Sequence, residues 1–583
     1  MKSTEQLGKT QKILFEVTVI VGFALLTVVV NLRTVRDGLN GLGDVLWHIT
    51  WVQHFSRQVL EGIPYPRWLA GTNYGYGSPT FVFYPPLSYY FGTVLKSIGL
   101  TGEQTMHFLL TFCLFLVGFN FYIYGRYRWG VWAGIVGGIC YITLPSVFDR
   151  VFLGGLSRAL ASALIPLGAY LTDRAIERRV WCIPLALLWL IVALTHTPSL
   201  LLFFLTWLGY LLFLGLTKSW RSIVAPACAA ILGFGMAALY LIPAILEQQW
   251  VNIEYMASSK GGWRDNMLGS TNVPLFPVSP LGTFNSNYTT VYEILCAILL
   301  FLMILSIVLT SRKTTQTKQL YHEAIGCFLF SLSILFLMSQ LSEPIWAQFS
   351  ILQKVQHPVR LTNLFEFGVI GLTAIATQLA LNVRKPLRIV ISIVLIFCMG
   401  FGLRYSYKLS RMMPALHNPG RGKIETIDTL KTALFDPYSE RLIDVTEYRP
   451  LLPDGSPPPA PELGQPKVRV VAGDAEVEID RWGSYVRELR VDAREPATLR
   501  LRTYYYPAWN VTVNGTPQPI ERPSDGTMAV KVESGISQVT FKYGGTAAFY
   551  WGLAASAFSS IVFVLISLGL IQQHSTRSQP ETS

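Results

Sequence analysis

Residues 13–30 read ILFEVTVIVGFALLTVVV, an apolar run close to the length that a helix needs to cross a bilayer. The sequence GDVLWH follows at residues 43–48, and turns rich in proline and glycine continue over about forty residues. This stretch contains an acid, histidines and many aromatic residues, whereas a plain connection needs only a few polar ones. It therefore predicts a membrane helix followed by an outer loop, residues 32–105, that holds a functional site.

The composition of the whole chain indicates a polytopic membrane protein. Of 583 residues, 51% are hydrophobic and 14% are charged, and the mean hydropathy is +0.40. These values lie outside the range of soluble globular proteins. Twelve runs near membrane-crossing length predict an α-helical fold with twelve spans, at residues 13–30, 106–124, 131–148, 156–171, 181–194, 200–216, 223–246, 291–309, 325–341, 361–381, 387–403 and 547–571.

A further run, residues 81–98, is only moderately apolar and is predicted to lie in the outer interface without crossing. If it does not cross, the short loops rich in Lys and Arg all fall on the side of the N-terminus. Basic loops favour the cytoplasm, so both termini are predicted to be cytoplasmic. The first loop, the loop at 248–288 and a soluble segment near the C-terminus then lie outside, across what we interpret as a bacterial inner membrane.

The distribution of charge and cysteine argues against a nucleic-acid-binding protein and against a disulfide-linked or cysteine–metal framework. Much of the net charge of +12 lies in the predicted cytoplasmic loops, where it orients helices, so no nucleic-acid partner is indicated. The seven cysteines all fall inside predicted spans, which argues against a disulfide framework or a cysteine-based metal site. The first span has no small-residue cleavage pattern after it, so it is predicted to be an uncleaved anchor.

The C-terminal third changes in character after residues 1–404, the predicted membrane domain. A segment at 405–466 contains a proline-rich linker, and residues 467–545 alternate apolar and polar residues between turn signals. This alternation predicts an extracytoplasmic β-sandwich, in which Asn514-Gly515 forms a hairpin turn. A last span at 546–572 and a cytoplasmic tail at 573–583 complete the predicted organisation.

Several short motifs together resemble one bacterial family. They are the outer loop already quoted, Thr195-His196-Thr197-Pro198, His357-Pro358-Val359-Arg360, Glu447-Tyr448-Arg449-Pro450 and Tyr505-Tyr506-Pro507-Ala508-Trp509. With these motifs the chain resembles the YfhO-like membrane proteins and relatives labelled "6-pyruvoyl-tetrahydropterin synthase-related", which belong among the GT-C glycosyltransferases. The resemblance implies an enzyme that moves a sugar from a polyprenyl-phosphate carrier to an acceptor outside the cytoplasm. No residue pattern suggests pterin chemistry.

Asp44 is the first candidate for catalysis. An acceptor hydroxyl must lose its proton as it attacks the sugar, which calls for a carboxylate base. The resemblance implies that an acid in the first outer loop acts as this base or holds a metal. The alternative is structural, because an Asp before an apolar run is also an ordinary helix N-cap. His48 lies one helical turn beyond Asp44, where it would orient the carboxylate or bond to a neighbour.

The departing lipid phosphate needs cationic groups, and the candidates lie in the other outer loops. Arg360 can donate two bonds to a phosphate from its planar fork, and His357 precedes it. Arg150 and Arg158 are further candidates, although interfacial arginines that bind headgroups are the alternative for all three. A second rank of candidates comprises Asp149, His196, Glu247, Arg67 and Trp68.

The second outer loop departs from the family pattern, because Leu153-Gly154-Gly155-Leu156-Ser157-Arg158 carries an Arg where the family has an acid. This departure weighs against a metal site built from Asp44 and Asp149. Binding of a divalent cation therefore remains one alternative, and no other cofactor is indicated. The expected partners are a polyprenyl-phosphate-sugar donor, a lipid or glycan acceptor and the membrane.

Two other functions fit the same sequence. One is a non-enzymatic transporter or flippase for lipid-linked glycans, and the other is an inactive scaffold that binds glycan. A transporter is expected to carry ionisable groups inside several spans, whereas most charges here fall near predicted helix ends. The sequence does not specify the sugar, the acceptor or the oligomeric state.

Overall fold

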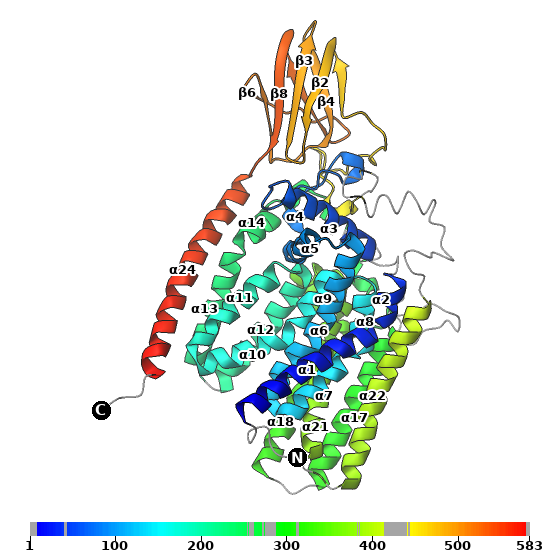
Figure 1. Ribbon diagram of the computed structural model, residues 1–583, viewed down its shortest axis with the longest axis vertical. Helices are drawn as coiled ribbons and strands as arrows, with labels where there is room; N and C mark the ends of the chain where they lie inside the picture. The colour runs from blue at the N-terminus through cyan, green and yellow to red at the C-terminus, as the bar shows by residue number, and fades with distance from the viewer. Residues whose placement is uncertain are drawn as a thin grey trace.

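A helical bundle with a sheet domain at one end makes up the computed structural model (Figure 1). The structure describes residues 8–39, 44–217, 219–253, 255, 262–270, 273, 287–310, 314–381, 383, 385–412, 436, 440 and 444–578. Most of the predicted loop at 248–288 and much of the predicted linker at 405–466 therefore lie outside the described residues.

The first half of the bundle contains fourteen helices, several of them short. They are α1 (Lys9–Val30), α2 (Leu32–Asp37), α3 (Val45–Leu60), α4 (Thr80–Phe83), α5 (Leu87–Ser97), α6 (Gly102–Trp129), α7 (Val131–Ile142), α8 (Pro145–Phe152), α9 (Leu156–Ala163), α10 (Ile165–Glu177), α11 (Cys182–Ala193), α12 (Thr197–Thr217), α13 (Trp220–Met236) and α14 (Ala238–Leu246). The second half contains α16 (Gly262–Asp265), α17 (Asn287–Thr310), α18 (Thr315–Met338), α19 (Glu343–Gln348), α20 (Ser350–Gln353), η7 (Pro358–Leu361), α21 (Thr362–Leu381) and α22 (Lys385–Met412), and α24 (Ala547–Ser578) follows the sheets.

The protein is an integral multi-pass membrane protein. Among the described residues, seven helices are long and apolar enough to cross a membrane, or nine when two bent pairs each count as one span. All twelve predicted runs coincide with helices, but the predicted number of twelve exceeds seven to nine. One reason is that the run at 156–171 is divided into α9 and α10 just before Pro166, where a proline starts the second helix.

Two of the predicted spans are bent instead of straight. The pair α7 and α8 is bent by 49° and the pair α13 and α14 by 71°. Pro145 starts α8, which accounts for the first bend because proline cannot donate the backbone hydrogen bond that a continuous helix needs. The moderately apolar run at 81–98 forms α4 and the eleven-residue α5, which is too short to cross a bilayer.

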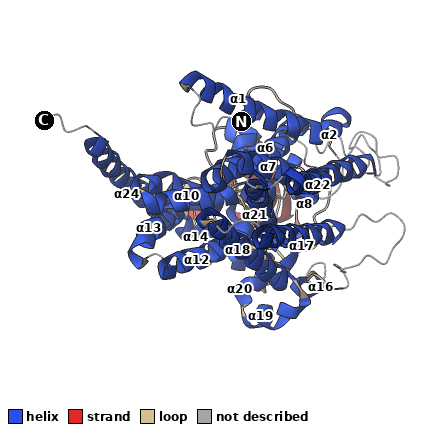
Figure 2. Cartoon of the chain, turned by 90° about the horizontal axis from the view of Figure 1, so that it is seen from below, coloured by secondary structure: helices blue, strands red, loops and turns tan. Residues whose placement is uncertain are grey.

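The centre of the bundle is α21, and 83% of the residues in its most apolar stretch are buried. The corresponding shares are 11% for α1 and 6% for α24, which lie at the edge (Figure 2). Small residues let neighbouring helices approach closely, as is common where helices pack in membranes. A Cβ on Gly134 of α7 would lie 2.7 Å from the Tyr122 carbonyl oxygen of α6. A Cβ on Gly552 of α24 would lie 2.6 Å from the Ala238 carbonyl oxygen of α14.

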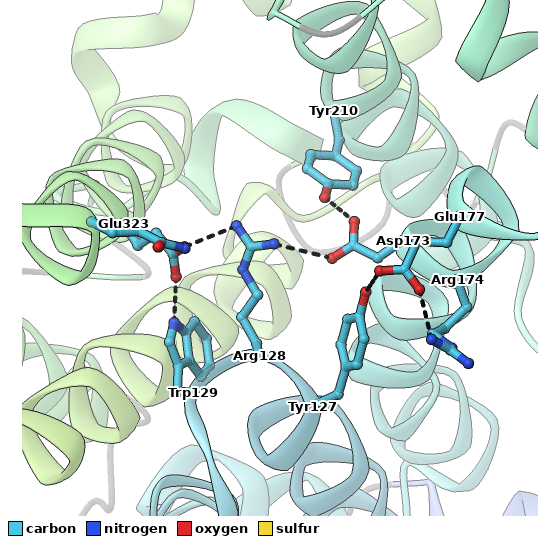
Figure 3. A network of polar contacts seen from close by, with 9 residues as sticks. Tyr127, Arg128, Trp129, Asp173, Arg174, Glu177, Tyr210 and Glu323 are labelled. Atoms are coloured by element: carbon cyan, nitrogen blue, oxygen red, sulfur yellow. Dashed lines mark hydrogen bonds and ion pairs between the residues drawn. The ribbon is translucent and has the colours of Figure 1, made fainter. Parts of the chain in front are cut away.

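Charged side chains join the helix ends far from the sheet domain (Figure 3). The Arg128 guanidinium at the end of α6 lies 3.1 Å from the Glu323 carboxylate of α18 and 3.6 Å from that of Asp173 in α10. Trp129 donates to Glu323 over 2.6 Å, and the Tyr210 hydroxyl of α12 donates to Asp173. Four helices are thus tied together at the end that carries the predicted cytoplasmic loops.

The chain has a C-terminal antiparallel β-sheet domain before its last helix, as the alternating sequence indicates. The strands are β1 (Val468–Ala472), β2 (Ala475–Trp482), β3 (Val486–Ala493), β4 (Ala497–Tyr504), β5 (Trp509–Val513), β6 (Thr516–Gln518), β7 (Thr527–Val532) and β8 (Gly535–Tyr543). They form sheets of order β1-β4-β7 and β2-β3-β8-β5-β6, whose apolar residues share one core. Asn514 and Gly515 have φ values of 50° and 79°, as the expected hairpin turn requires.

The sheet domain rests on the first outer loop, and this contact fixes the position of the loop. The buried Trp68 ring lies 5.7 Å from the Trp509 ring of β5, and the Trp68 amide donates to the Tyr485 hydroxyl over 3.1 Å. Gly77 packs against the same indole and has a φ of 81°, which favours glycine. One apolar core therefore includes both the loop and the sheets.

Candidate functional site

Asp44 lies directly before α3, in the first outer loop. Its backbone is helical, with φ −89° and ψ 0°, and its carboxylate makes no capping hydrogen bond to α3. The side chain is exposed, and within the described part of the chain no hydrogen bond or ion pair of the carboxylate is found. The structural alternative, an N-cap through the side chain, is thus absent from this geometry. The carboxylate is available for other chemistry.

The second outer loop holds the backbone of Asp44 in place. The Asp44 amide donates to the Leu153 carbonyl oxygen over 3.0 Å, and Gly154 packs directly against Val45. A Cβ on Gly154 would lie 2.6 Å from the Val45 nitrogen and 2.7 Å from its Cα. The loop at 153–158 therefore positions the candidate base by close packing.

We expect Gly154→Ala to destabilise the protein and to displace Asp44. The φ of 77° at Gly154 is unfavourable for alanine by about 1–3 kcal/mol, and the contact with Val45 adds to this cost. The thermal unfolding midpoint of the purified protein measures the effect. Gly209→Ala in α12 is the matched control, since its Cβ meets nothing within 4 Å. Equal midpoints for the two variants would contradict the packing role.

His48 is buried behind Asp44 and bonded to a tyrosine. Its Nδ1 lies 2.6 Å from the Tyr89 hydroxyl, and the side chain is 3% exposed. Burial lowers the pKa of His48 to about 4, while the Asp44 carboxylate acts in the opposite direction. His48 is therefore neutral at pH 7, and the electrostatic interaction places it near Asp44, as the one-turn spacing predicts.

Arg158 and Arg360 form the cationic side of the site. The Arg360 guanidinium donates to the Val355 carbonyl over 2.8 Å and to the Gln356 side chain over 3.0 Å. Arg158 donates to the Asn363 side chain over 3.3 Å. Neither has a carboxylate within 4 Å in the described ranges, and both interact electrostatically with Asp44. They are two partly buried cations held by neutral acceptors, which suits a bound anion.

Arg150 differs from these two because its charge is already compensated. Its Nη2 lies 2.5 Å from the Glu366 Oε1 of α21, and the two side chains are 3% and 0% exposed. Asp149 next to it accepts a hydrogen bond from the Tyr405 hydroxyl at 2.9 Å from each carboxylate oxygen. Asp149 and Arg150 thus join α8 to neighbouring helices, and the described residues contain no group of three His, Cys, Asp or Glu side chains that could hold a metal.

His196 lies at the start of α12 and interacts electrostatically with Arg360, Arg158 and His48. The Ser199 amide donates to its Nδ1 over 3.3 Å, which leaves the proton of the neutral ring on Nε2. Burial lowers the pKa of His196 well below its usual value, and Arg360, Arg158 and His48 act in the same direction. His196 is therefore a neutral hydrogen-bond donor beside the two arginines. His357, the fourth phosphate candidate, precedes η7 with φ −126°, three residues before Arg360.

Three second-rank candidates connect the first loop and α14 to the sheet domain. Arg67 donates to the Gly544 carbonyl over 2.6 Å and its guanidinium lies 3.7 Å from the centre of the Phe549 ring. Trp68 belongs to the shared core described above. Glu247 at the end of α14 accepts hydrogen bonds from the hydroxyls of Tyr506 and Thr546. All three stabilise the arrangement around the site through contacts within the chain.

Sequence reasoning missed Asp444, which is 2% exposed and holds the first loop in place. Its carboxylate accepts a hydrogen bond from the Trp51 indole of α3 over 2.9 Å and one from the Thr80 hydroxyl over 2.5 Å. Tyr448 follows in the same segment, packs near Tyr84 and interacts electrostatically with Arg360. The signal that could have found both was the Glu447-Tyr448-Arg449-Pro450 motif, which lies just after Asp444.

Because buried histidines are neutral in the folded protein, we expect the protein to lose stability in mild acid. Burial lowers the pKa of His48 to about 4 and that of His54 to about 3, from 6.5 in the unfolded chain. Below pH 6.5 the unfolded state binds more protons than the folded state, so stability falls as pH falls, by about 1.4 kcal/mol per pH unit for each histidine. Above pH 6.5 the contribution is fully present. The unfolding midpoint measured at about pH 7.5 and about pH 5 tests this.

His48→Gln provides the control for this pH dependence. Glutamine is neutral at both pH values, so the variant is expected to lose less stability between them than the wild-type protein. A pH dependence that is unchanged in His48→Gln would contradict the assignment of a buried neutral imidazole at this position.

Comparisons with known proteins were made for the whole chain. A family model described as "6-pyruvoyl-tetrahydropterin synthase related domain; membrane protein" matches residues 81–408. The match includes Arg158, His196 and Arg360, and Asp44 precedes it. The crystal structure of ArnT from Cupriavidus metallidurans in the apo state is similar at a TM-score of 0.27 with 13% identity, over 63% of this chain and 80% of that chain. A search of curated proteins gave no match.

Proposed function

The chain belongs to the 6-pyruvoyl-tetrahydropterin synthase-related family of membrane proteins, and from this premise we propose that it is a GT-C-type glycosyltransferase. It transfers a sugar from a polyprenyl-phosphate-linked donor to an extracytoplasmic acceptor, which is a glycan, a lipid or a polymer. One observation carries the proposal: the Asp44 carboxylate lies within electrostatic reach of two arginines that have no carboxylate partner among the described residues. A base and an anion-binding pair are thus adjacent.

The proposed reaction is a displacement at the anomeric carbon. The acceptor hydroxyl oxygen forms the new bond to this carbon and gives its proton to the Asp44 carboxylate. The bond between the anomeric carbon and the phosphate oxygen breaks, and its electron pair leaves with the polyprenyl phosphate. Arg158 and Arg360 stabilise the charge that develops on this phosphate. His196 donates a further hydrogen bond from Nε2.

His48 acts through Asp44 in this proposal. As a neutral imidazole bonded to Tyr89, it gives the proposed base an uncharged neighbour. Tyr84 and Tyr89 pack against the imidazole ring of His48 and keep it buried. Arg150 and His357, which were candidates for phosphate binding, are assigned no step.

The proposed orientation follows from the basic loops. The Arg128 end of the bundle faces the cytoplasm together with both termini, and the sheet domain and Asp44 lie outside a bacterial inner membrane. The proposed organisation is a GT-C-like domain at 1–404 with eleven of the twelve proposed spans, a linker at 405–466, a β-sandwich at 467–545, the twelfth span at 546–572 and a tail at 573–583. A donor carried by a lipid reaches such a site from the outer leaflet.

The experiment is donor turnover by the purified full-length protein. Polyprenyl-phosphate donors bearing different radiolabelled sugars are incubated with the protein and with membranes that supply acceptors. Release of free polyprenyl phosphate together with label in a new product is the expected result for at least one sugar. If every donor of the panel stays intact while a positive-control transferase consumes its own donor, the proposed function is wrong.

A transporter of lipid-linked glycans is the second candidate, because charged side chains are buried inside the bundle. Glu366 of α21 and Glu293 of α17 are both 0% exposed, and ionisable groups inside spans often belong to transport pathways. Movement of an intact labelled donor across proteoliposomes without release of polyprenyl phosphate would favour this function over transfer.

A further inference from the structure

Among the residues that the structure describes, several buried polar atoms inside the bundle have no hydrogen-bond partner, and they lie close together. They are the Tyr141 hydroxyl of α7, Arg150 Nε of α8, Glu293 Oε2 of α17 and Glu366 Oε2 of α21. Direct contacts join them: the Arg150–Glu366 pair at 2.5 Å and the bond from the Ser146 amide to Glu293 Oε1 at 3.4 Å. Tyr141 interacts electrostatically with Glu293, Arg150 and Glu366.

The charges of this cluster do not balance. Glu293 and Glu366 are both 0% exposed, and Arg150 supplies one positive charge, which is paired with Glu366. Arg158 interacts with Glu366 at longer range and forms no ion pair with a carboxylate among the described residues. The nearby Asp149 carboxylate, held by Tyr405, adds no positive charge. A second carboxylate buried in an apolar bundle without a cation of its own is very costly as an anion, and such groups become neutral by binding a proton.

The unpartnered atoms also indicate what fills the space between them. Arg150 Nε is a hydrogen-bond donor only, the two carboxylate oxygens accept, and the Tyr141 hydroxyl does both. A metal cation needs acceptors alone, and a donor that points at it is repelled. Water donates and accepts, and a buried water usually has two to four such partners. Unsatisfied buried polar groups in a native protein are a common sign of such water.

We propose that these side chains form a hydrated proton-binding site, in which Glu293 is a neutral carboxylic acid and Glu366 pairs with Arg150. The ligand is one proton together with ordered water. This site is separate from the one at Asp44 and goes beyond the proposed function, since it holds whichever reaction the chain performs.

The bound proton has a consequence for Arg158, which interacts electrostatically with both Arg150 and Glu366. With Glu293 neutral, the charges of Arg150 and Glu366 cancel and no surplus negative charge draws the Arg158 guanidinium inward. An ionised Glu293 would add such a charge close by. The proton therefore helps to keep Arg158 available on the outer side of the bundle.

Infrared spectroscopy of the full-length protein in detergent at pH 7 tests the site without any assay of activity. A protonated carboxyl group has a C=O stretching band that carboxylates lack and that shifts in D₂O. We expect the wild-type spectrum to contain such a band and Glu293→Gln to lose part of it. Glu343→Gln, an exposed carboxylate paired with Arg264, is the control and should leave the band unchanged. A band that is equal in wild-type and Glu293→Gln spectra overturns the proposal.

Thermal unfolding gives a second measurement that does not depend on the band. Glutamine resembles a protonated glutamate in shape and charge, so Glu293→Gln should unfold at nearly the wild-type temperature. Glu366→Gln should unfold at a clearly lower temperature, because it leaves the buried Arg150 unpaired. If Glu293→Gln is destabilised as strongly as Glu366→Gln, or does not fold while the wild-type spectrum lacks the band, Glu293 is not the proton carrier.

Discussion

Replacing Asp44 by Asn is expected to reduce the turnover of a polyprenyl-phosphate donor by about 10²–10⁴-fold, the usual contribution of a general base. Asn keeps the shape of the side chain but cannot accept the proton of the acceptor hydroxyl. The loss should appear in kcat, because the arginines that bind the donor are unchanged. The protein itself should stay folded, since the Asp44 carboxylate makes no capping hydrogen bond. The measurement is the initial rate of polyprenyl phosphate release, with the unfolding midpoint recorded in parallel.

Asp492→Asn in β3 is the matched control for this variant, because it removes an exposed carboxylate of the same shape far from the bundle. It should retain wild-type turnover. Asp44→Glu is informative as well, since it restores a base in a displaced position and should recover part of the rate. Full activity of Asp44→Asn at wild-type expression would rule out Asp44 as the base and would favour a scaffold role.

The arrangement of Asp44, His48 and Arg360 could be anticipated because each follows from a local rule. An acid at the start of a helix and a histidine one turn later share a face, and loops on one side of a membrane meet at the same end of a bundle. The apolar runs located the helices for the same reason, since burial in lipid leaves a continuous signal in the sequence. The alternation of apolar and polar residues, which has a period of two, predicted the positions of the strands.

Partners that are distant in sequence could not be anticipated. Arg150 and Arg158 look equivalent in the sequence, yet among the described residues Arg150 alone of the two forms an ion pair with Glu366, which comes more than two hundred residues later. Which arginine remains uncompensated depends on helix packing, which no local pattern records. Asp444 was missed for the same reason, because its partners Trp51 and Thr80 belong to the other end of the chain.

The roles of Arg67, Trp68 and Glu247 show a related difficulty. Polar and aromatic residues in an outer loop resemble substrate contacts when the sheet domain that covers them is unknown. Trp68 has a 0% exposed side chain because β5 packs on it, and the hydroxyls bonded to Glu247 come from Tyr506 and Thr546. In a loop that a second domain covers, residue type alone does not distinguish residues that bind substrate from residues that contact the covering domain.

Arg360→Ala is expected to weaken donor binding, because a hydrogen bond between charged groups contributes about 1.5–3 kcal/mol, or roughly 10–100-fold in affinity. The KM for the donor should rise by this factor, and kcat should fall as well because the leaving phosphate loses a cation. Arg360→Lys keeps the charge without the planar fork, so an intermediate loss is expected. The measurement is the donor dependence of initial rates for these variants and the wild-type protein.

Variants of Arg158 and Arg150 distinguish a specific role in phosphate binding from a general need for positive charge at this end of the bundle. Arg158→Ala should resemble Arg360→Ala in its kinetics and retain the unfolding midpoint within a few degrees, because its only described hydrogen bond goes to the neutral Asn363 side chain. Arg150→Ala should instead lower stability by about 3–5 kcal/mol, since it leaves Glu366 buried without its partner. If Arg158→Ala and Arg360→Ala change only stability, the phosphate is bound elsewhere and the two arginines serve the fold.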